Sequence, residues 1–220
     1  MSHAKASFAP ARRSSAAWLW VFVPIVAVGG WWYPYLGLLV IGCMLAPVAV
    51  AAVRGRYWCG WLCPRGAFFD AIMARVSRHR PAPAWLRGRA FRIGMLAFLM
   101  TVMTVQLVLA YPHGEAMARV FVLLLGVTTL AGLVLAIVYQ PRTWCTFCPM
   151  GTMSSWVAVG RRPLQVSAAC RDCGACGKVC PMSLAPHRVD ATHADCLQCE
   201  RCVARCPVKA LSFTPPTDIR

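Results

Sequence analysis

The residues best suited to chemistry are cysteines near the carboxyl end of the chain. The stretches CRDCGACGKVCP and CLQCERCVARCP, at residues 170–181 and 196–207, each have the spacing C-x2-C-x2-C-x3-C-P. Three thiolates separated by two residues can hold one face of an iron–sulfur cube in a single loop, and the fourth cysteine, turned away by the proline, ligates another cube. The spacing therefore predicts two 4Fe–4S clusters with exchanged fourth ligands.

Each predicted cluster takes three ligands from one run and one from the other. The ligands of cluster 1 are Cys170, Cys173, Cys176 and Cys206, and those of cluster 2 are Cys196, Cys199, Cys202 and Cys180. Zinc is the alternative, but zinc ribbons use two C-x2-C pairs rather than two runs of four that end in proline. We therefore expect iron–sulfur clusters at these cysteines.

Four more cysteines lie in two related turns. RYWCGWLCPRG at 56–66 contains Cys59 and Cys63, and RTWCTFCPMG at 142–151 contains Cys145 and Cys148. Such thiols can hold a metal or a cluster, form redox disulfides, or only shape the chain. Proline and glycine alone can make a turn, and the nearby arginines favour thiolates. We therefore predict a redox or metal site at these four cysteines.

The composition indicates that a membrane positions these cysteines. The chain has 220 residues, 59% of them hydrophobic, 13 cysteines and a formal net charge of +16, and its mean hydropathy is +0.56. Soluble domains are nearer half apolar. The basic residues lie beside apolar runs rather than in one solvated domain, which favours basic flanks of membrane helices over nucleic-acid binding. The cysteine spacing favours metal over disulfides.

Four apolar stretches are predicted to cross the membrane. They lie at about 16–33, 35–53, 91–111 and 120–139, and each is near the roughly 20 residues that a spanning helix needs. A cleaved signal peptide is the alternative for the first stretch. Because no small-x-small site precedes a polar mature region, we expect an uncleaved helix.

Lysine and arginine residues orient these helices. They precede the first stretch and follow the fourth, and the long middle loop is rich in arginine, whereas the turn of the first pair has none and that of the second pair has only Arg119. The positive-inside rule then puts both termini, the middle loop and both Cys-Pro turns in the cytoplasm. We expect a multi-pass protein of the bacterial cytoplasmic (inner) membrane, with its C-terminal cysteines in the cytoplasm.

The middle loop contains an expected amphipathic helix. In GAFFDAIMARVSRHR, at 66–80, one helical face carries Phe69, Ile72, Met73 and Val76. This pattern predicts a helix that lies in the lipid headgroup layer. Asp70 would sit in its first turn, where the helix dipole favours an anion.

The C-terminal cysteine runs resemble the bacterial two-cluster ferredoxin domain over about 166–213. The resemblance implies a small α+β fold with short strands at LAPHRV (184–189) and ALSF (210–213). Basic residues surround the motifs, and they can either receive an acidic partner or form a solvated face near anionic lipid. These residues are Lys178, Arg188, Arg201, Arg205 and Lys209.

The predicted fold class is an all-α four-helix transmembrane bundle with a small C-terminal α+β domain of the bacterial ferredoxin type. The expected boundaries are a cytoplasmic tail at 1–15, the transmembrane domain with both Cys-Pro turns at 16–160, a linker at 161–168, the two-cluster domain at 169–213 and a tail at 214–220. Each helix pair with its following turn forms one repeat, so the repeat axis would lie along the membrane normal and bring the four turn cysteines together.

The whole chain resembles the membrane polyferredoxins of the NapH, NosR and CcoG type. The resemblance rests on the four apolar stretches, the CGWLCPRGAF turn, the second Cys-Pro turn and the C-terminal runs. The family turn is C-x3-C-P, as at Cys59 and Cys63, whereas Cys145 and Cys148 form C-x2-C-P. The resemblance implies either electron transfer between the quinol pool and respiratory enzymes or reduction of metal ions in metalloenzyme assembly.

Other residues carry weaker expectations. No histidine lies inside a predicted transmembrane helix, which argues against membrane haem. His113 and Glu115 either accept quinol protons or are simply solvated. Gln106 and Thr104 either face a quinone or hydrogen-bond between helices. Soft ligands for Cu(I), with packing as their alternative role, are Cys43, Met44, Met95, Met100 and Met103.

Two functions remain open on the sequence. The first is a membrane-anchored iron–sulfur protein, such as a quinol dehydrogenase subunit, that couples quinol or quinone to a respiratory redox partner. The alternative is a maturation factor that supplies electrons for copper reduction or cofactor assembly. Both predict two 4Fe–4S clusters, contact with membrane lipid and a protein redox partner, and neither involves nucleic acid.

Overall fold

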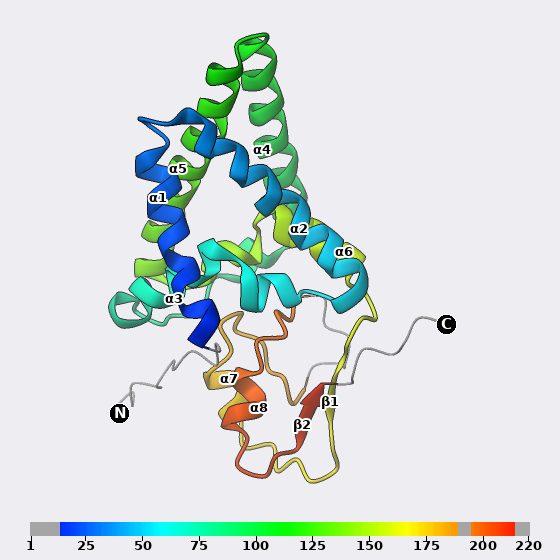
Figure 1. Ribbon diagram of the computed structural model, residues 1–220. Coiled ribbons are helices and arrows are strands. Elements are labelled where there is room, and N and C mark those ends of the chain that lie inside the picture. Colours follow the sequence, from blue (N-terminus) through cyan, green and yellow to red (C-terminus); the bar gives the residue numbers. More distant parts are fainter. Residues whose placement is uncertain (1–13, 189–194, 214–220) are drawn as a thin grey trace.

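The protein is described here from a computed structural model, which describes residues 14–188 and 195–213. Helices form the larger part, and a small C-terminal domain with the cysteine runs lies at one end of them (Figure 1). The residues that lie outside the described ranges include His3, Lys5, Arg12, Arg13 and His193.

Two helical hairpins form the apolar part. The first contains the 3-10 helix η1 (Ser14–Val21), α1 (Phe22–Gly29), the 3-10 helix η2 (Pro34–Leu38) and α2 (Leu39–Arg54). The second contains α4 (Arg89–Ala110) and α5 (Gly114–Val138). Three helices in the described residues are long and apolar enough to cross a membrane, namely Pro34–Arg54, Arg89–Ala110 and Gly114–Val138.

The first predicted span is shorter than expected. Its apolar helix covers only Trp18–Gly29, because η1 has 3-10 geometry and the helix ends at Gly29 and Gly30. Pro24 also removes one backbone donor inside it. Of the four predicted membrane-spanning stretches, three therefore form helices that are long enough to cross a membrane, and the first does not.

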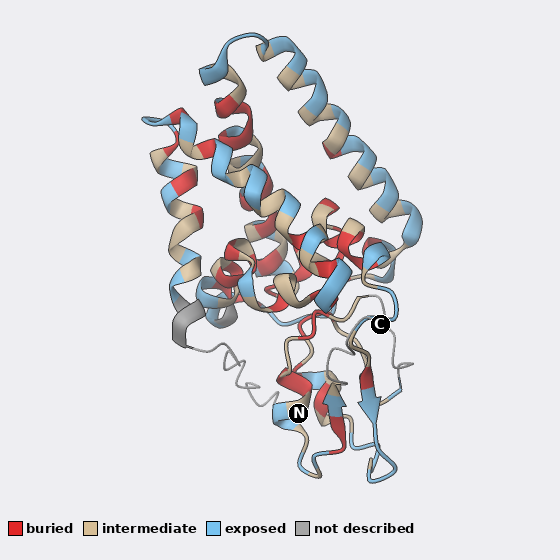
Figure 2. Cartoon of the chain, turned by 45° about the vertical axis from the view of Figure 1, so that its right-hand side comes forward, coloured by how far each residue is buried: buried red, intermediate tan, exposed pale blue. Residues whose placement is uncertain are grey.

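α5 is the central helix of this part. It contacts α1, η2, α3 and α4, and its buried side includes Ala118, Val122 and Ala136. A Cβ atom at Gly37 would overlap the carbonyl oxygen of Ala118, so a small residue lets η2 approach α5, as is common between membrane helices. α4, in contrast, buries only Leu99 (Figure 2), as expected of an apolar helix that faces lipid.

Each hairpin continues into a cysteine turn and a helix. The π-helical turn η3 (Trp58–Leu62) leads into α3 (Pro64–Val76), and the 3-10 turn η5 (Thr143–Thr146) leads into α6 (Pro149–Val157). Pro64 and Pro149 occupy the first helical position, where a missing N–H costs no hydrogen bond. α3 contacts α1 and α5, and α6 contacts α2 and α4, so both helices join the two hairpins.

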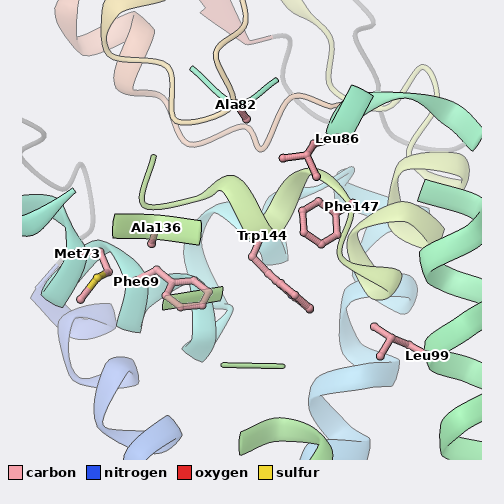
Figure 3. Packing of buried hydrophobic residues seen from close by; sticks show 8 residues of the cluster. All are labelled: Phe69, Met73, Ala82, Leu86, Leu99, Ala136, Trp144 and Phe147. Atoms are coloured by element: carbon pink, nitrogen blue, oxygen red, sulfur yellow. The ribbon is translucent and has the colours of Figure 1, made fainter. Parts of the chain in front are cut away.

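The main apolar core lies where α3 and α5 meet the second turn (Figure 3). Its buried residues are Phe69, Met73, Ala82, Leu86, Leu99, Ala136, Trp144 and Phe147. Leu86 belongs to the short 3-10 helix η4 (Ala84–Arg87), which precedes α4. The core thus anchors the helix after the first cysteine turn against the second cysteine turn.

This packing corrects the prediction for the middle loop. α3 does form, but Phe69 is fully buried and Met73 is buried, whereas Ile72 and Val76 are exposed. The expected lipid-facing stripe is therefore wrong for Phe69 and Met73, because half of that stripe packs on α5 and η5 rather than on lipid. A Cβ at Gly132 would lie 2.5 Å from Phe69 Cζ, so the ring of Phe69 fills the space that this glycine leaves.

The C-terminal domain, residues 164–213, contains a two-stranded sheet and two short helices. β1 (Leu164–Val166) pairs antiparallel with β2 (Leu211–Phe213), and Gln165 lies opposite Ser212. α7 (Ala175–Lys178) and α8 (Arg201–Arg205) each follow a residue in the left-handed conformation, Gly174 and Glu200. These helices are equivalently placed in the two cysteine runs, which have the same spacing.

One of the two predicted strands is in the wrong place. The stretch at 210–213 does contain β2, but residues 184–188 form turns and irregular structure. The partner of β2 is β1, which lies in the stretch predicted as a linker. The apolar residues Leu164 and Val166 alternate with Gln165, but a run of three residues gives too weak a pattern for a strand to be recognised.

Candidate functional site: two thiol sites in contact

The structure brings the four Cys-Pro cysteines to one cavity of about 140 Å³. Cys59 and Cys63 come from η3 and the start of α3, and Cys145 and Cys148 come from η5 and the start of α6. A space of roughly 10–15 Å³ is enough for one water, so this cavity is large enough for a multi-atom group. Residues from different hairpins thus share one thiol-lined space, which we call the thiol cavity.

Two arginines cross between the Cys-Pro turns. Arg56 precedes Trp58 and Cys59 in the first turn, and a Cβ at Gly151 of the second turn would lie 2.9 Å from Arg56 Nη2. Arg142 holds the same place in the second turn, and a Cβ at Gly66 of the first would lie 2.8 Å from Arg142 Nη1. The repeated arginine and glycine therefore form a reciprocal pair of contacts that fix the two turns against each other.

The guanidinium group of Arg142 donates hydrogen bonds to three oxygen atoms. Its Nη1 donates to the carbonyl oxygen of Cys59 at 2.6 Å, and its Nε and Nη2 donate to the two carboxylate oxygens of Asp70 at 3.1 and 2.6 Å. Burial lowers the pKa of Arg142, but the Asp70 carboxylate outweighs burial and raises it overall. Arg142 is 1% exposed, so it is a fixed cation inside the protein.

A third arginine, Arg65, lines the thiol cavity itself. Its guanidinium carbon lies 4.7 Å from the centre of the Trp144 ring. Within the described part of the chain, its buried Nε and Nη2 atoms have no hydrogen-bond partner. Burial lowers the pKa of Arg65, and the neighbouring thiol groups of Cys148, Cys145 and Cys63 act to raise it. A buried cation of this kind calls for an anion in the cavity.

The thiols are poorly suited to carry that negative charge by themselves. Burial raises the pKa of Cys145 to about 12, although the Arg142 charge lowers it. Burial also raises the pKa of Cys59, against the lowering effect of Arg56. Bound iron stabilises thiolates directly. Four cysteines, a cavity and surrounding arginines therefore fit an anionic iron–sulfur cluster.

Within residues 14–188 and 195–213, no three His, Cys, Asp or Glu side chains converge closely enough to hold one ion. The ligands of an iron–sulfur cube bind separate irons, so they stand around the cofactor instead of meeting at one point.

The second thiol site lies in the C-terminal domain. Cys180, Cys196, Cys199 and Cys202 line one cavity of about 40 Å³, and these are the four cysteines predicted for cluster 2. Burial, together with the nearby Cys199 and Cys196, raises the pKa of Cys180 and of Cys202 to about 12. Cys180 therefore lies with the other run of cysteines, as exchange of the fourth ligand requires.

The cysteines predicted for cluster 1 are less enclosed. Cys176 and Cys206 pack with Leu164 and Leu211 in a small apolar cluster, whereas Cys173 is exposed and Cys170 is half-buried. His187 lies close by, with Nδ1 3.2 Å from Cys176 Sγ and Nε2 2.8 Å from Asp172 Oδ1. Sequence analysis did not single out this histidine, because its contact with Cys176 follows from the fold and not from a motif.

The thiol cavity and the C-terminal domain are joined by buried ion pairs. Asp70 on α3 accepts from Arg142 at 2.6 Å and from Arg201 on α8 at 2.7 Å. The prediction that Asp70 lies in the first turn of its helix is wrong, because α3 begins at Pro64 and has no acidic residue in that turn. Asp70 instead links the second Cys-Pro turn to the cluster 2 region. Arg201 is 9% exposed, so it is unavailable to an external partner, unlike the exposed Lys178, Arg188, Arg205 and Lys209.

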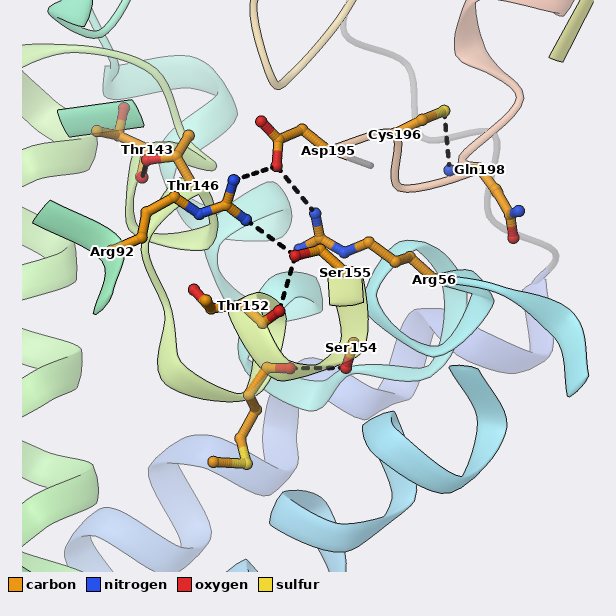
Figure 4. Close-up of polar contacts among 11 residues, drawn as sticks. Arg56, Arg92, Thr143, Thr146, Thr152, Ser154, Ser155, Asp195, Cys196 and Gln198 are labelled. Atoms are coloured by element: carbon orange, nitrogen blue, oxygen red, sulfur yellow. Dashed lines mark hydrogen bonds and ion pairs between the residues drawn. The ribbon is translucent and has the colours of Figure 1, made fainter. Parts of the chain in front are cut away.

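A second polar network lies beside the first (Figure 4). Asp195 Oδ1 is 2.6 Å from Arg92 Nη1 and 3.8 Å from Arg56 Nη1. Arg92 Nη2 donates to Ser155 Oγ on α6 at 3.2 Å. Asp195 directly precedes Cys196, so this network connects α4, α6 and the first Cys-Pro turn with the cluster 2 loop.

The backbones also meet at this junction. Trp61 Nε1 donates to the carbonyl oxygen of Gln198 at 2.9 Å. A Cβ at Gly60 would overlap the carbonyl oxygen of Leu197, so only glycine allows the cluster 2 loop to lie this close to η3. The loop that carries Cys196 and Cys199 therefore rests on the turn that carries Cys59.

Other predicted residues lie apart from these thiols. Gln106 lines a cavity of about 510 Å³ with Arg119 at the far end of α4 and α5, and its buried Oε1 has no partner within the described ranges. Thr104 donates to Met100 of its own helix at 2.9 Å. Glu115 and Arg119 form an exposed pair at 4.0 Å. Cys43 and Met44, in contrast, line the thiol cavity.

The matches to known proteins agree with this geometry. A family model described as a 4Fe-4S binding domain matches residues 36–94 and 121–167. The two segments contain both Cys-Pro turns and none of the eight C-terminal cysteines. A putative electron transport protein, YccM of Escherichia coli, is 25% identical over 78% of this chain. The ferredoxin-type protein NapH of Haemophilus influenzae is 24% identical over 82% of it.

These matches support a relation of the chain to the NapH-like membrane polyferredoxins. An uncharacterized protein of Methanocaldococcus jannaschii, MJ0749, is 26% identical over 76% of this chain. The chain spans 54% of the length of YccM, 68% of MJ0749 and 70% of the Haemophilus NapH. No solved structure matches it.

Proposed function

We propose that this NapH-like protein is an electron-transfer protein of the bacterial inner membrane that couples the quinol pool to a redox partner. Its Cys-Pro turns and its C-terminal domain, which we infer to be a two-cluster ferredoxin domain, would face the cytoplasm. The observation that carries the proposal is the direct contact of the two thiol sites through η3 and the cluster 2 loop. The names of YccM and NapH support a role in electron transport.

The cofactors are inferred from the ligand sets. Cys59, Cys63, Cys145 and Cys148 would hold one iron–sulfur cluster, for which the match of a 4Fe-4S model to these turns is the support. Cys180, Cys196, Cys199 and Cys202 would hold cluster 2, and Cys170, Cys173, Cys176 and Cys206 would hold cluster 1. Iron–sulfur clusters supply one-electron transfer.

The protein's own residues supply the surroundings. Arg56, Arg65 and Arg142 stabilise negative charge in the thiol cavity, and the apolar core excludes water from it. The loop that would hold cluster 2 lies against the turn that carries Cys59, whereas Cys173 on the cluster 1 side is exposed. A protein partner would therefore be met at the cluster 1 side, where the exposed Lys178 and Arg188 favour an acidic surface.

The thiol cavity also reaches toward the bilayer. Its other lining residues include Phe22, Val40, Met44 and Leu125, which come from α1, α2 and α5. An apolar wall within the membrane part suits a lipid-soluble carrier such as quinol. The larger cavity at Gln106 is less suitable, because α5 rises about 27 Å between Val120 and Val138 and so separates it from the thiols.

The proposal is tested by mutating one cysteine of each turn. Protein in lipid nanodiscs is mixed with a reduced short-chain quinol, and reduction of the C-terminal clusters is followed by EPR. Cys59→Ser and Cys145→Ser should each abolish reduction by quinol, while dithionite still reduces both C-terminal clusters. If both variants accept electrons from quinol at the normal rate, the Cys-Pro turns are structural.

A second function, metal-ion reduction for cofactor assembly, is favoured by one observation. Cys43 and Met44 add soft ligands to the thiol cavity, and such ligands select Cu(I). This function predicts that the cluster-loaded protein binds Cu(I) and that Cys43→Ser together with Met44→Leu abolishes binding. Unchanged Cu(I) binding in the double variant would contradict it.

A further inference from the structure

In the two Cys-Pro turns, the arginines that contact the opposite turn pair with carboxylates from different parts of the chain. Arg142 pairs with Asp70, which lies on the helix that follows Cys63. The residue at the same distance after Cys148 is Ser155 on α6. A hydroxyl group cannot neutralise Arg56 in the way that Asp70 neutralises Arg142, so the repeat lacks one carboxylate.

The C-terminal domain provides a carboxylate at this position. Asp195 Oδ1 lies 3.8 Å from Arg56 Nη1 and 2.6 Å from Arg92 Nη1, and Arg92 also contacts Ser155 (Figure 4). The side chain of Arg56 is 1% exposed and that of Asp195 is 14% exposed. The pair is therefore largely shielded from water. Charges act on each other and on nearby groups more strongly in such an environment than in water.

Arg56 lies where the two thiol sites meet. It lines the thiol cavity together with Cys59, and its ion-pair partner Asp195 directly precedes Cys196, a predicted cluster 2 ligand. The turn η3 and the cluster 2 loop are in direct contact at this point. One cation thus lies between two sites that come from different parts of the chain.

We propose that Arg56 and Asp195 are positioning residues that set the reduction potential of cluster 2 with opposite signs and leave that of cluster 1 unchanged. Reduction adds negative charge, so a buried cation raises the potential of a nearby cluster and a buried carboxylate lowers it. Cluster 1 has separate neighbours, since Cys176 contacts His187 and Arg188 pairs with Asp172. The inference rests on the proposed function only in assuming that clusters occupy the C-terminal cysteines.

The test measures midpoint potentials of both C-terminal clusters by EPR in anaerobically purified full-length protein, with Cys199→Ser used to assign the cluster 2 signal. Arg56→Gln should shift the potential of cluster 2 to a lower value. Arg56→Lys, which keeps the positive charge, should retain most of the original potential. Asp195→Asn, which keeps the shape of the side chain, should shift cluster 2 to higher potential. Arg188→Gln, a change at an exposed arginine, should leave cluster 2 unchanged.

The outcomes separate this inference from the proposed function. Shifts of opposite sign at cluster 2 with cluster 1 unchanged support it, and if Arg56→Gln fails to fold, the sign of the Asp195→Asn shift decides. Equal shifts of both clusters, or no shift in cluster 2, would overturn it while the clusters and their electron transfer remain. Absence of iron from the C-terminal cysteines would instead overturn the proposed function.

Discussion

Asp70 shows how single buried charges hold the two parts together. Its carboxylate accepts from Arg142 in the second Cys-Pro turn and from Arg201 in the C-terminal domain. All three side chains are at most 9% exposed. Two cations of this kind are tolerated in the interior only because the carboxylate lies between them.

We expect Asp70→Asn to destabilise the protein strongly. Removing one member of a buried ion pair typically costs about 3–5 kcal/mol, because its partner is left uncompensated. Here two arginines lose their carboxylate, and the C-terminal domain should dock less firmly. Thermal unfolding in detergent, with limited proteolysis of the C-terminal domain, measures both effects.

The exposed pair of Glu115 and Arg119 gives a matched control. Its atoms are 4.0 Å apart and both side chains are mostly exposed, so Glu115→Gln should leave the unfolding temperature nearly unchanged. Equal effects of the two substitutions would show that Asp70 does not hold the interface.

Residue types and spacing indicate candidate ligands but not the residues that surround them. The C-x2-C-x2-C-x3-C-P runs identify eight candidate ligands, and the structure places Cys180 with Cys196, Cys199 and Cys202. The contacts of Asp70 with Arg201 and of Asp195 with Arg56 join residues more than a hundred positions apart. Such contacts leave no local pattern in one sequence, because an aspartate that forms a buried ion pair cannot be distinguished there from an aspartate on the surface.

Among the elements, α3 is the clearest case in which tertiary packing overrides a sequence pattern. Its hydrophobic stripe is interpreted from the sequence as a lipid-facing surface, but periodicity alone does not distinguish such a surface from one that packs in a protein core. The structure packs Phe69 on Gly132 and leaves Ile72 exposed. The three long apolar helices were predicted correctly, because some twenty consecutive apolar residues are a strong signal.

Two substitutions on α3 distinguish core packing from lipid anchoring. Phe69→Ala should lower the unfolding free energy by about 3–5 kcal/mol, the usual range for an emptied aromatic site. Ile72→Ala should have a small effect in detergent, because its side chain is exposed. Thermal unfolding of the two variants measures this, and a larger loss for Ile72→Ala than for Phe69→Ala would contradict the packing.

At the scale of the molecule, both Cys-Pro turns and the C-terminal domain lie at one end, and the turn between α4 and α5 lies at the other (Figure 1). The positive-inside rule assigns the first end to the cytoplasm. A reporter fused after Arg220 should therefore be active only in the cytoplasm, and one inserted near His113 only outside. A periplasmic signal from the fusion at Arg220 would reverse the orientation.

Iron counting tests the central claim, that the two Cys-Pro turns jointly hold a cofactor beside the C-terminal clusters. Anaerobically purified protein should contain about 12 irons, four for each of three clusters. Cys59→Ser and Cys145→Ser should each remove about four irons and spare the rest, whereas Cys43→Ser, on the same cavity, should remove none. About eight irons in the unmodified protein, unchanged by Cys59→Ser and Cys145→Ser, would contradict the claim.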